Sequence, residues 1–314
     1  MTSIEISVRG NWVKVPAIQL DGNTIVVKGR LVRIASVHDE EWLESEVSNP
    51  EVYISQLKSG VNPRADLFTF TQKPTCATPR FDYAHDLVSV AVAKVADYKT
   101  WWESLPQETR KNVRRAYKRG VTIQSKAFDD DVVRGIQEVQ NETPERQGKP
   151  YPHYGKTLEQ VRRDHSGFVD RSDFICAYVN EEFIGFCKVV YRGDIASILQ
   201  LNSKIAHYDK RPSNALLAKA IELCSSRGMS HLVYGRFNYG NKGDSSLREF
   251  KVRNGFYEIP TPRYYVPLTT WGRVAAGMKL YRGAMAFLPA PVIAAFVAAR
   301  AKWYDRKAKS NKPV

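Results

Sequence analysis

Residues 212–235 read PSNALLAKAIELCSSRGMSHLVYG, and they carry the clearest structural signal in the chain. Apolar residues recur here every three or four positions, which predicts a helix with one buried face. They are Leu216, Leu217, Ala220, Ile221 and Cys224. Pro212 suits the first turn of this helix, and Gly228 suits its C-terminal cap. The run that follows, His231–Arg236, predicts a strand. The stretch therefore indicates a helix packed on a sheet.

Similar signals extend on both sides of this helix. Acidic first turns, two-residue turns and glycine stops separate the segments, and Ser246 with Glu249 forms a capping box. We expect strands at Val121–Gln124, Phe174–Val179, Phe183–Tyr191, Ile195–Leu201 and Phe256–Ile259, and helices at Asp129–Asn141, Lys156–His165 and Ser246–Asn254. The expected order is β-α-α-β-β-β-α-β-α-β, which is a mixed α/β arrangement.

The first 96 residues are expected to be mostly strand. Short segments rich in β-branched and aromatic residues alternate there with Gly, Pro, Asn and Asp. The expected strands are Ile4–Val8, Thr24–Val27, Leu31–Ile34, Val52–Gln56, Leu67–Thr71 and Leu87–Val92. This region contains no motif that indicates a function.

The net charge of +14 comes from two stretches of the chain. Residues 110–119 hold six basic residues and no acid, and residues 271–314 hold nine basic residues and one acid. The other 260 residues carry 32 basic and 32 acidic side chains. The excess charge should therefore act locally, on an anionic partner near each stretch. This distribution excludes a generally basic protein.

The first basic stretch lies on a predicted helix that ends at Gly120. Arg110, Arg114 and Lys118 are spaced four apart, and Lys111, Arg115 and Arg119 form a neighbouring row on the same face. A solvated surface helix is one interpretation. Binding of a phosphorylated donor or acceptor is the other, because like charges at this spacing repel and a bound anion relieves the repulsion.

The order of elements over residues 120–267 resembles the GNAT acyltransferase fold. Three stretches resemble the FemABX-like branch, whose members move aminoacyl or acyl groups: Thr109–Val121, Pro212–Gly235 and the pair Phe250-Lys251. The resemblance implies an α/β (α+β) protein with a GNAT-like mixed sheet flanked by helices. It also implies two GNAT-like lobes and a C-terminal helical tail. We expect a strand-rich lobe at 1–119 that ends in the basic helix, a transferase domain at 120–267 and a basic tail at 268–314.

One loop departs from the GNAT pattern. GNAT proteins that use acyl-CoA have a glycine-rich loop before the central helix, where backbone N–H groups hold the pyrophosphate. Here Arg211 and Ser213 stand at the glycine positions, and Pro212 has no N–H. We therefore favour aminoacyl-tRNA as the donor, with acyl-CoA as the alternative. Lys210 and Arg211 are candidate phosphate ligands. The donor acts as a co-substrate, so no bound cofactor is expected.

Acyl transfer to an amine needs a polarised carbonyl and a path for protons. The resemblance places Lys251 beside the reacting ester, and we expect Phe250 to face the core and fix the direction of this lysine. Tyr234 and Tyr239 are candidates to protonate the leaving oxygen. His207 is a candidate general base, because histidine titrates near neutral pH. Each of these residues also has an interpretation without a catalytic role. Lys251 would be a surface lysine, the two tyrosines would be core residues and His207 would be a structural histidine.

The loop around His153 and Tyr154 is expected to border the acceptor site, since it is rich in Pro, Gly and aromatic residues and joins two helices. An ordinary rigid loop is the alternative. No His and carboxylate cluster and no C-x-x-C pair occurs, so no metal is expected.

The C-terminal region includes a run of 17 uncharged residues, 283–299. It contains two prolines and is shorter than the about 20 apolar residues that a membrane-spanning helix needs. We favour a helical hairpin packed on the protein. The alternative is a segment of 271–314 that lies on an anionic membrane surface, helped by the basic residues beyond 299. The N-terminus does not resemble a signal peptide, so we expect a cytoplasmic protein. The membrane alternative would make it peripheral at the inner face of the membrane. The sequence does not indicate the oligomeric state.

Three functions remain open at this point. The first is an aminoacyl- or acyltransferase of the FemABX-like kind, acting on an amine of a cell-envelope precursor, a peptide or a small metabolite. The second is an acyl-CoA-dependent GNAT acyltransferase. The third is a non-catalytic module that binds nucleic acid or membrane through its two basic stretches.

Overall fold

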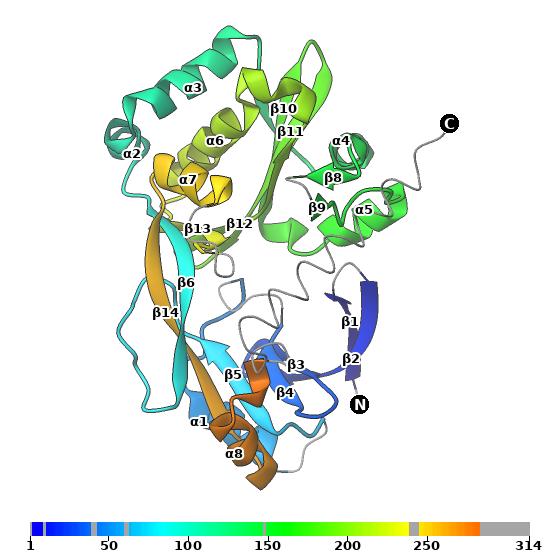
Figure 1. Ribbon diagram of the computed structural model, residues 1–314, viewed down its shortest axis with the longest axis vertical. Coiled ribbons are helices and arrows are strands. Elements are labelled where there is room, and N and C mark those ends of the chain that lie inside the picture. The colour runs from blue at the N-terminus through cyan, green and yellow to red at the C-terminus, as the bar shows by residue number, and fades with distance from the viewer. Residues whose placement is uncertain are drawn as a thin grey trace, which may run out of the picture.

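A computed structural model describes residues 2–8, 11–38, 43–59, 63–146, 149–238 and 245–282. Twelve of the described strands form one mixed sheet, in the order β1-β2-β3-β4-β5-β14-β6-β13-β12-β11-β10-β7 (Figure 1). The strands are β1 (Thr2–Val8), β2 (Asn11–Leu20), β3 (Asn23–Lys28), β4 (Ile34–Val37), β5 (Leu67–Thr71), β6 (His85–Lys94), β7 (Thr122–Lys126), β8 (Glu145–Arg146), β9 (Lys149–Pro150), β10 (Ser172–Val179), β11 (Glu182–Arg192), β12 (Ile195–Ser203), β13 (His231–Arg236) and β14 (Tyr257–Pro267). The helices are α1 (Pro50–Lys58), α2 (Tyr98–Ser104), α3 (Gln107–Lys118), α4 (Asp130–Asn141), α5 (Leu158–His165), α6 (Pro212–Ser226), α7 (Ser246–Arg253) and α8 (Thr270–Gly277), with 3-10 turns η1 (Val169–Arg171), η2 (Ile205–Lys210) and η3 (Leu280–Arg282).

The two halves of the chain share this sheet. Strand β6 lies between β14 and β13 and pairs antiparallel with both. Strand β14, although late in the sequence, also pairs antiparallel with β5. The sheet therefore runs without interruption through the strand-rich first region and the second. The division into residues 1–119, 120–267 and 268–314 stays a prediction.

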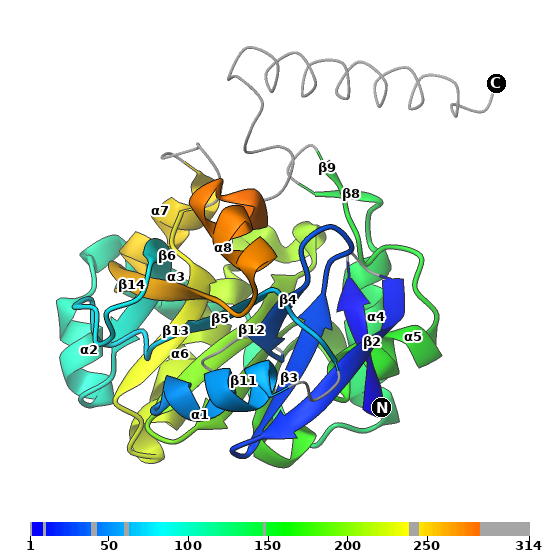
Figure 2. The ribbon, with the colours of Figure 1, turned by 90° about the horizontal axis from the view of Figure 1, so that it is seen from below.

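Helices cover both faces of the second half of the sheet, because alternate strand residues point to opposite sides. Phe174 and Cys176 of β10 pack with α4 and α5. Their neighbours Ile175 and Ala177 pack with α6, α3 and α2. In the first half, Phe68 packs with α1 and Leu67 packs with α8. Figure 2 shows α1 and α8 on opposite faces of these strands.

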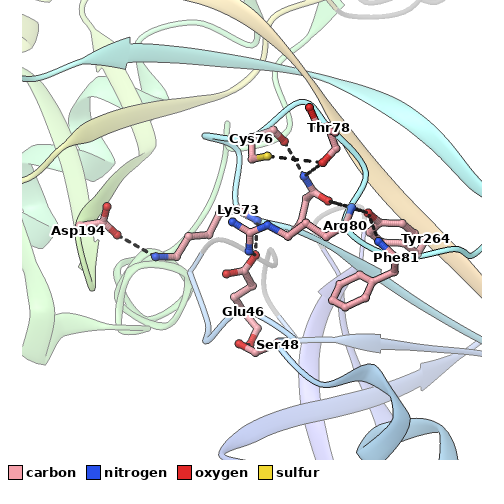
Figure 3. A network of polar contacts seen from close by, with 10 residues as sticks. Glu46, Ser48, Lys73, Cys76, Thr78, Arg80, Phe81, Asp194 and Tyr264 are labelled. Carbon is pink, nitrogen blue, oxygen red and sulfur yellow. Dashed lines mark hydrogen bonds and ion pairs between the residues drawn. The ribbon is translucent and has the colours of Figure 1, made fainter.

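A polar network joins the two halves on the side of the β11–β12 turn (Figure 3). Lys73 Nζ lies 3.0 Å from Asp194 Oδ1 across the junction. Glu46 accepts hydrogen bonds from the guanidinium of Arg80, at 2.8 Å, and from the backbone N–H of Lys73, at 3.0 Å. The Tyr264 hydroxyl of β14 accepts from the Arg80 N–H at 2.8 Å. These bonds join the loop between β5 and β6 to Glu46, to the β11–β12 turn and to β14.

From residue 121 onward the expected helices and strands are present in the expected order, and the mixed α/β class is confirmed. The two-residue strands β8 and β9, between α4 and α5, were not expected. Val52–Gln56 is a wrong prediction, since these residues lie in α1. Pro50 starts that helix, and Tyr53, Ile54 and Leu57 lie on one helical face. The N-cap of α7 is Ser245 rather than Ser246, because the Ser245 side chain accepts from the Arg248 N–H.

Two further differences concern the first half of the chain. Of the expected strand Leu31–Ile34, only Ile34 belongs to a strand, β4. Strand β2 was not expected at all, because Pro16 and several polar residues interrupt its apolar pattern.

In the part of the chain that the structure describes, no helix is long and apolar enough to cross a membrane. The uncharged run 283–299 and the basic residues after it lie outside the described residues.

Candidate functional site

The site begins where two parallel strands separate. Strands β12 and β13 pair only from Ile195↔His231 to Ser197↔Val233, and β12 then continues alone on this side to Ser203. A pocket of about 500 Å³ lies beyond the point of separation. Its lining includes Leu201, Ser203, Ser213, Tyr234, Leu247 and Phe250. The ends of β12 and β13, the start of α6 and the start of α7 thus surround one pocket.

Lys251 of α7 lies beneath this pocket and is fully buried. Its Nζ donates to the carbonyl oxygens of Tyr234, at 2.6 Å, and Arg236, at 2.7 Å. The Lys251 ammonium also stands 4.4 Å from the centre of the Tyr234 ring. These carbonyls belong to the part of β13 that no longer pairs with β12, so the lysine supplies donors that the neighbouring strand does not. Burial lowers the pKa of Lys251 to about 8.

Phe250, the other member of the predicted pair, lines the pocket while it packs against the core. The expected contact of Phe250 with the core is therefore present, although this side chain also borders the pocket. Lys251 differs from the expectation, because its ammonium is directed at β13 carbonyls and it is not among the residues that line the pocket. On a helix, consecutive residues point about 100° apart, so only one of the two can face the pocket directly.

Hydroxyl groups line the pocket wall. Tyr234 borders it, and its ring meets the edge of Phe256 at 5.8 Å. The Ser203 and Ser213 hydroxyls lie 2.9 Å apart, with Ser213 in the first turn of α6. Tyr239, a predicted proton donor, lies outside the described residues.

His207 is engaged elsewhere and is not among the residues that line the pocket. It lies in η2, and its Nε2 is 3.1 Å from Glu182 Oε2. A hydrogen bond from Lys204 is the main reason why the pKa of Glu182 is lowered. Lys210 approaches Asp209 at 3.6 Å, and the exposed Arg211 adopts a left-handed conformation directly before α6. The role of His207 as a general base stays a prediction.

The opposite wall includes residues that the sequence did not single out. Arg146 donates to the Ser203 carbonyl at 3.1 Å and to the Val139 carbonyl at 2.8 Å. Its guanidinium stacks 4.8 Å from the centre of the Tyr151 ring. The Tyr151 hydroxyl accepts from the amide of Asn202 at 2.9 Å, which brings this loop to the pocket. No sequence motif surrounds Arg146. Tyr151 belongs to the loop around His153, whose content of Pro, Gly and aromatic residues predicted a place beside the acceptor site.

The predicted acceptor residues lie in that same loop. The His153 ring packs against Tyr151, with 5.3 Å between centroids, and its Nδ1 lies 3.3 Å from Lys156 Nζ. Burial, followed by the Lys156 charge, lowers the pKa of His153. Tyr154 is exposed at the surface. His153 thus contacts Tyr151, which in turn contacts Arg146 and Asn202 of the pocket lining, and neither His153 nor Tyr154 lines the pocket.

The basic helix α3 leads toward the pocket. Its buried face, with Val113 and Ala116, joins the core cluster that contains α6. Arg114 is exposed and lies 5.6 Å from the centre of the Trp102 ring, Lys118 is exposed, and Arg110 is half-buried. At its C-terminal end, Arg119 donates to the carbonyl of Asp209 at 2.6 Å and to its carboxylate at 3.0 Å. Tyr208, the residue before Asp209, lines the pocket, so the row of cations ends near the pocket mouth.

Within the described residues, no group of three or more His, Cys, Asp and Glu side chains could hold a metal ion.

A mixed sheet whose parallel strands separate beside a central helix, with a pocket at the separation, is the arrangement expected of a GNAT-like fold. Solved structures share this fold. FemX superposes with a TM-score of 0.56 at 13% identity, over 82% of this chain and 89% of that one. The C-terminal domain of a putative lysylphosphatidylglycerol synthetase from Agrobacterium fabrum superposes with a TM-score of 0.55 at 12% identity, over 83% and 86%. L-PGS from Bacillus licheniformis gives 0.54 at 15% identity, over 84% and 87%.

The chain therefore has the FemABX- and GNAT-like fold that the sequence predicted. No protein-family model matches the chain, and no curated protein matches it by sequence.

Proposed function

We propose that the protein transfers an acyl or aminoacyl group to an amine at the pocket between β12, β13 and α7. The observation that carries this proposal is the pocket itself, which lies where the two strands separate and has the hydroxyls of Tyr234, Ser203 and Ser213 on its walls. The fold that surrounds it is shared with FemX, with the C-terminal domain of a putative lysylphosphatidylglycerol synthetase and with L-PGS.

The proposed reaction forms an amide from an activated ester. The acceptor nitrogen attacks the ester carbonyl and a C–N bond forms; the C–O bond to the donor then breaks. The amine loses one proton, and the leaving oxygen gains one. The Tyr234 hydroxyl is the candidate donor to that oxygen. The Ser213 N–H, at the positive end of α6, is suited to stabilise the negative charge that develops on the carbonyl oxygen.

Two features support aminoacyl-tRNA as the donor. Pro212 has no N–H and the N–H of Asn214 donates to the Arg211 carbonyl at 3.1 Å, so the start of α6 has few amide donors for a pyrophosphate. The basic face of α3 continues to the pocket mouth through Arg119 and Asp209. A nucleic-acid backbone offers many phosphates to such a face, whereas CoA offers few. The acceptor is an amine of a cell-envelope precursor, a peptide or a small metabolite.

The donor is tested by incubating the protein with aminoacyl-tRNA and, separately, with acyl-CoA thioesters, and by identifying products by mass spectrometry. A triple variant, Arg110→Gln, Arg114→Gln and Lys118→Gln, should raise the KM for aminoacyl-tRNA and reduce its salt dependence. Neutralising the exposed lysines Lys14, Lys28 and Lys58 provides the matched control. Transfer from acyl-CoA but not from aminoacyl-tRNA would establish the alternative donor.

The site is tested by Tyr234→Phe, which removes only the hydroxyl. We expect kcat to fall by about 10²-fold or more, which is the usual size of a general-acid contribution. Tyr257→Phe, at an exposed position of β14, is the control. Unchanged turnover in the Tyr234 variant would reject this residue as the proton donor.

A further inference from the structure

A second surface gathers exposed apolar side chains away from the pocket. Trp271, Val274 and Met278 follow one side of α8 and its last turn at i, i+3 and i+7, and they are 42%, 44% and 58% exposed. Leu31, 75% exposed, joins them from the turn before β4, because Trp271 Nε1 donates to the Leu31 carbonyl at 3.0 Å. We call these four side chains the α8 patch. Large apolar side chains gathered at one place on a surface indicate an interaction site.

The surroundings of the α8 patch are basic. Arg30 adjoins Leu31 in the chain, and Arg273 and Lys279 lie beside the patch residues of α8; all three are exposed. The sequence from Leu268 to Tyr304 contains no acid. A partner of this surface must therefore accept apolar side chains and attract cations at the same time.

The charge of the remaining chain argues against the tail as this partner. Residues 300–314 carry six basic residues and one acid, so this part of the tail and the cations around the patch repel each other. The uncharged run 283–299 is the competing occupant, and vesicle binding that the α8 substitutions leave unchanged would identify it. RNA would attract the cations but has no apolar medium for Leu31, Val274 and Met278. A bilayer with anionic headgroups offers both, and the uncharged run that follows the patch in sequence suits the same surface.

We propose that the α8 patch docks the protein on an anionic membrane surface. The Trp271 N–H already has its acceptor in the Leu31 carbonyl, so the indole ring can leave water without losing a hydrogen bond. Val274, Met278 and Leu31 enter the interface beside it, and the flanking cations contact the headgroups. Figure 1 shows α8 at the opposite end of the molecule from α2 and α3, so docking leaves the basic face of α3 exposed. The proposal does not depend on the transfer reaction.

The test is sedimentation of the full-length chain with two kinds of vesicle, phosphatidylcholine alone and phosphatidylcholine with one third phosphatidylglycerol. We expect binding to the anionic vesicles and little binding to the neutral ones. The double variant Val274→Asp, Met278→Asp should partition at least about tenfold less, since two carboxylates would enter the interface. Val169→Asp with Leu199→Asp changes two exposed apolar residues on other elements and should bind like the wild type.

A second measurement covers the case in which the Asp variant folds poorly. Lipids brominated on the acyl chain should quench tryptophan fluorescence of the wild type, and the conservative Trp271→Phe variant should lose much of that quenching. Three results would each overturn the proposal: equal binding of the wild type to both vesicles, unchanged binding of a folded Asp variant, or quenching that does not depend on Trp271. Binding to RNA with no binding to anionic vesicles would also overturn it.

Discussion

The buried ammonium of Lys251 should make the stability of the protein depend on alkaline pH. Burial lowers the pKa of this lysine to about 8 from the ordinary value of 10.5. Between these two values the unfolded chain holds about one more proton than the folded protein, so the free energy of unfolding rises with pH. Each pH unit contributes up to about 1.4 kcal/mol, and the whole window contributes about 3 kcal/mol. This contribution is complete above pH 10.5 and is lost as the pH falls through 8.

Lys251→Met isolates this effect, because it removes the charge and keeps most of the side-chain volume. The assay is urea unfolding of both proteins, followed by circular dichroism at pH 7, 8, 9 and 10. The stability of the wild type should increase relative to the variant as the pH rises. Subtraction removes the other titrating groups, which both proteins share. Lys111→Met, at an exposed position of α3, should show no such trend.

At pH 7 the same variant has two opposing effects. It leaves the carbonyls of Tyr234 and Arg236 without their Lys251 donor, which costs about 1–3 kcal/mol for each buried group that stays unsatisfied. It also removes the cost of burying a charge. A difference between wild type and variant that stays constant from pH 7 to 10 would refute the reasoning, since the ammonium would then be as well solvated in the folded protein as in the unfolded chain.

Two further predictions concern the second half of the sheet. Burial lowers the pKa of His165 to about 3, so stability that is complete above pH 6.5 is lost as the pH falls toward 3, by up to about 5 kcal/mol. His165→Gln should weaken this loss in acid unfolding followed by circular dichroism, and an unchanged acid midpoint would argue against a buried neutral ring. Gly135→Ala would place a Cβ 2.3 Å from the Phe183 ring and should cost about 1–3 kcal/mol, measured by thermal unfolding. Gly167→Ala, with no atom within 4 Å of the added Cβ, is its control, and equal melting temperatures would contradict the packing of α4 on β11.

The second half of the fold could be predicted because its signals are local. Helix α6 has an apolar stripe with a proline start and a glycine stop, and its neighbours in sequence are short strands joined by tight turns. The run Val52–Gln56 lacks a comparable pair of start and stop signals, and a short apolar segment fits a buried strand and a helix equally well. The position of β6 between β14 and β13 depends on pairing across more than 100 residues, which no local pattern reports.

The site shows the same division between local and tertiary information. The sequence identified the pair Phe250-Lys251, but it did not show where the two side chains point. Strands β12 and β13 separate after Ser197↔Val233, and Lys251 donates to a β13 carbonyl beyond that point. Arg146 reaches the pocket from a two-residue strand, through carbonyls of two other elements. Neither arrangement has a sequence pattern, because each one depends on three segments that meet only in the folded protein.

The two basic regions should act independently of each other. Helix α3 and helix α8 lie at opposite ends of the molecule (Figure 1), and at physiological salt exposed charges are screened beyond about 8 Å. Neutralising Arg110, Arg114 and Lys118 should therefore change the KM for a phosphate-rich donor and leave vesicle binding unchanged. The substitutions Val274→Asp and Met278→Asp in α8 should reduce vesicle binding. They should leave the KM for the donor unchanged when it is measured in solution without vesicles. If one set of substitutions changed both properties, a single anionic partner would have to span both ends, and the separate assignment of the two basic regions would fail.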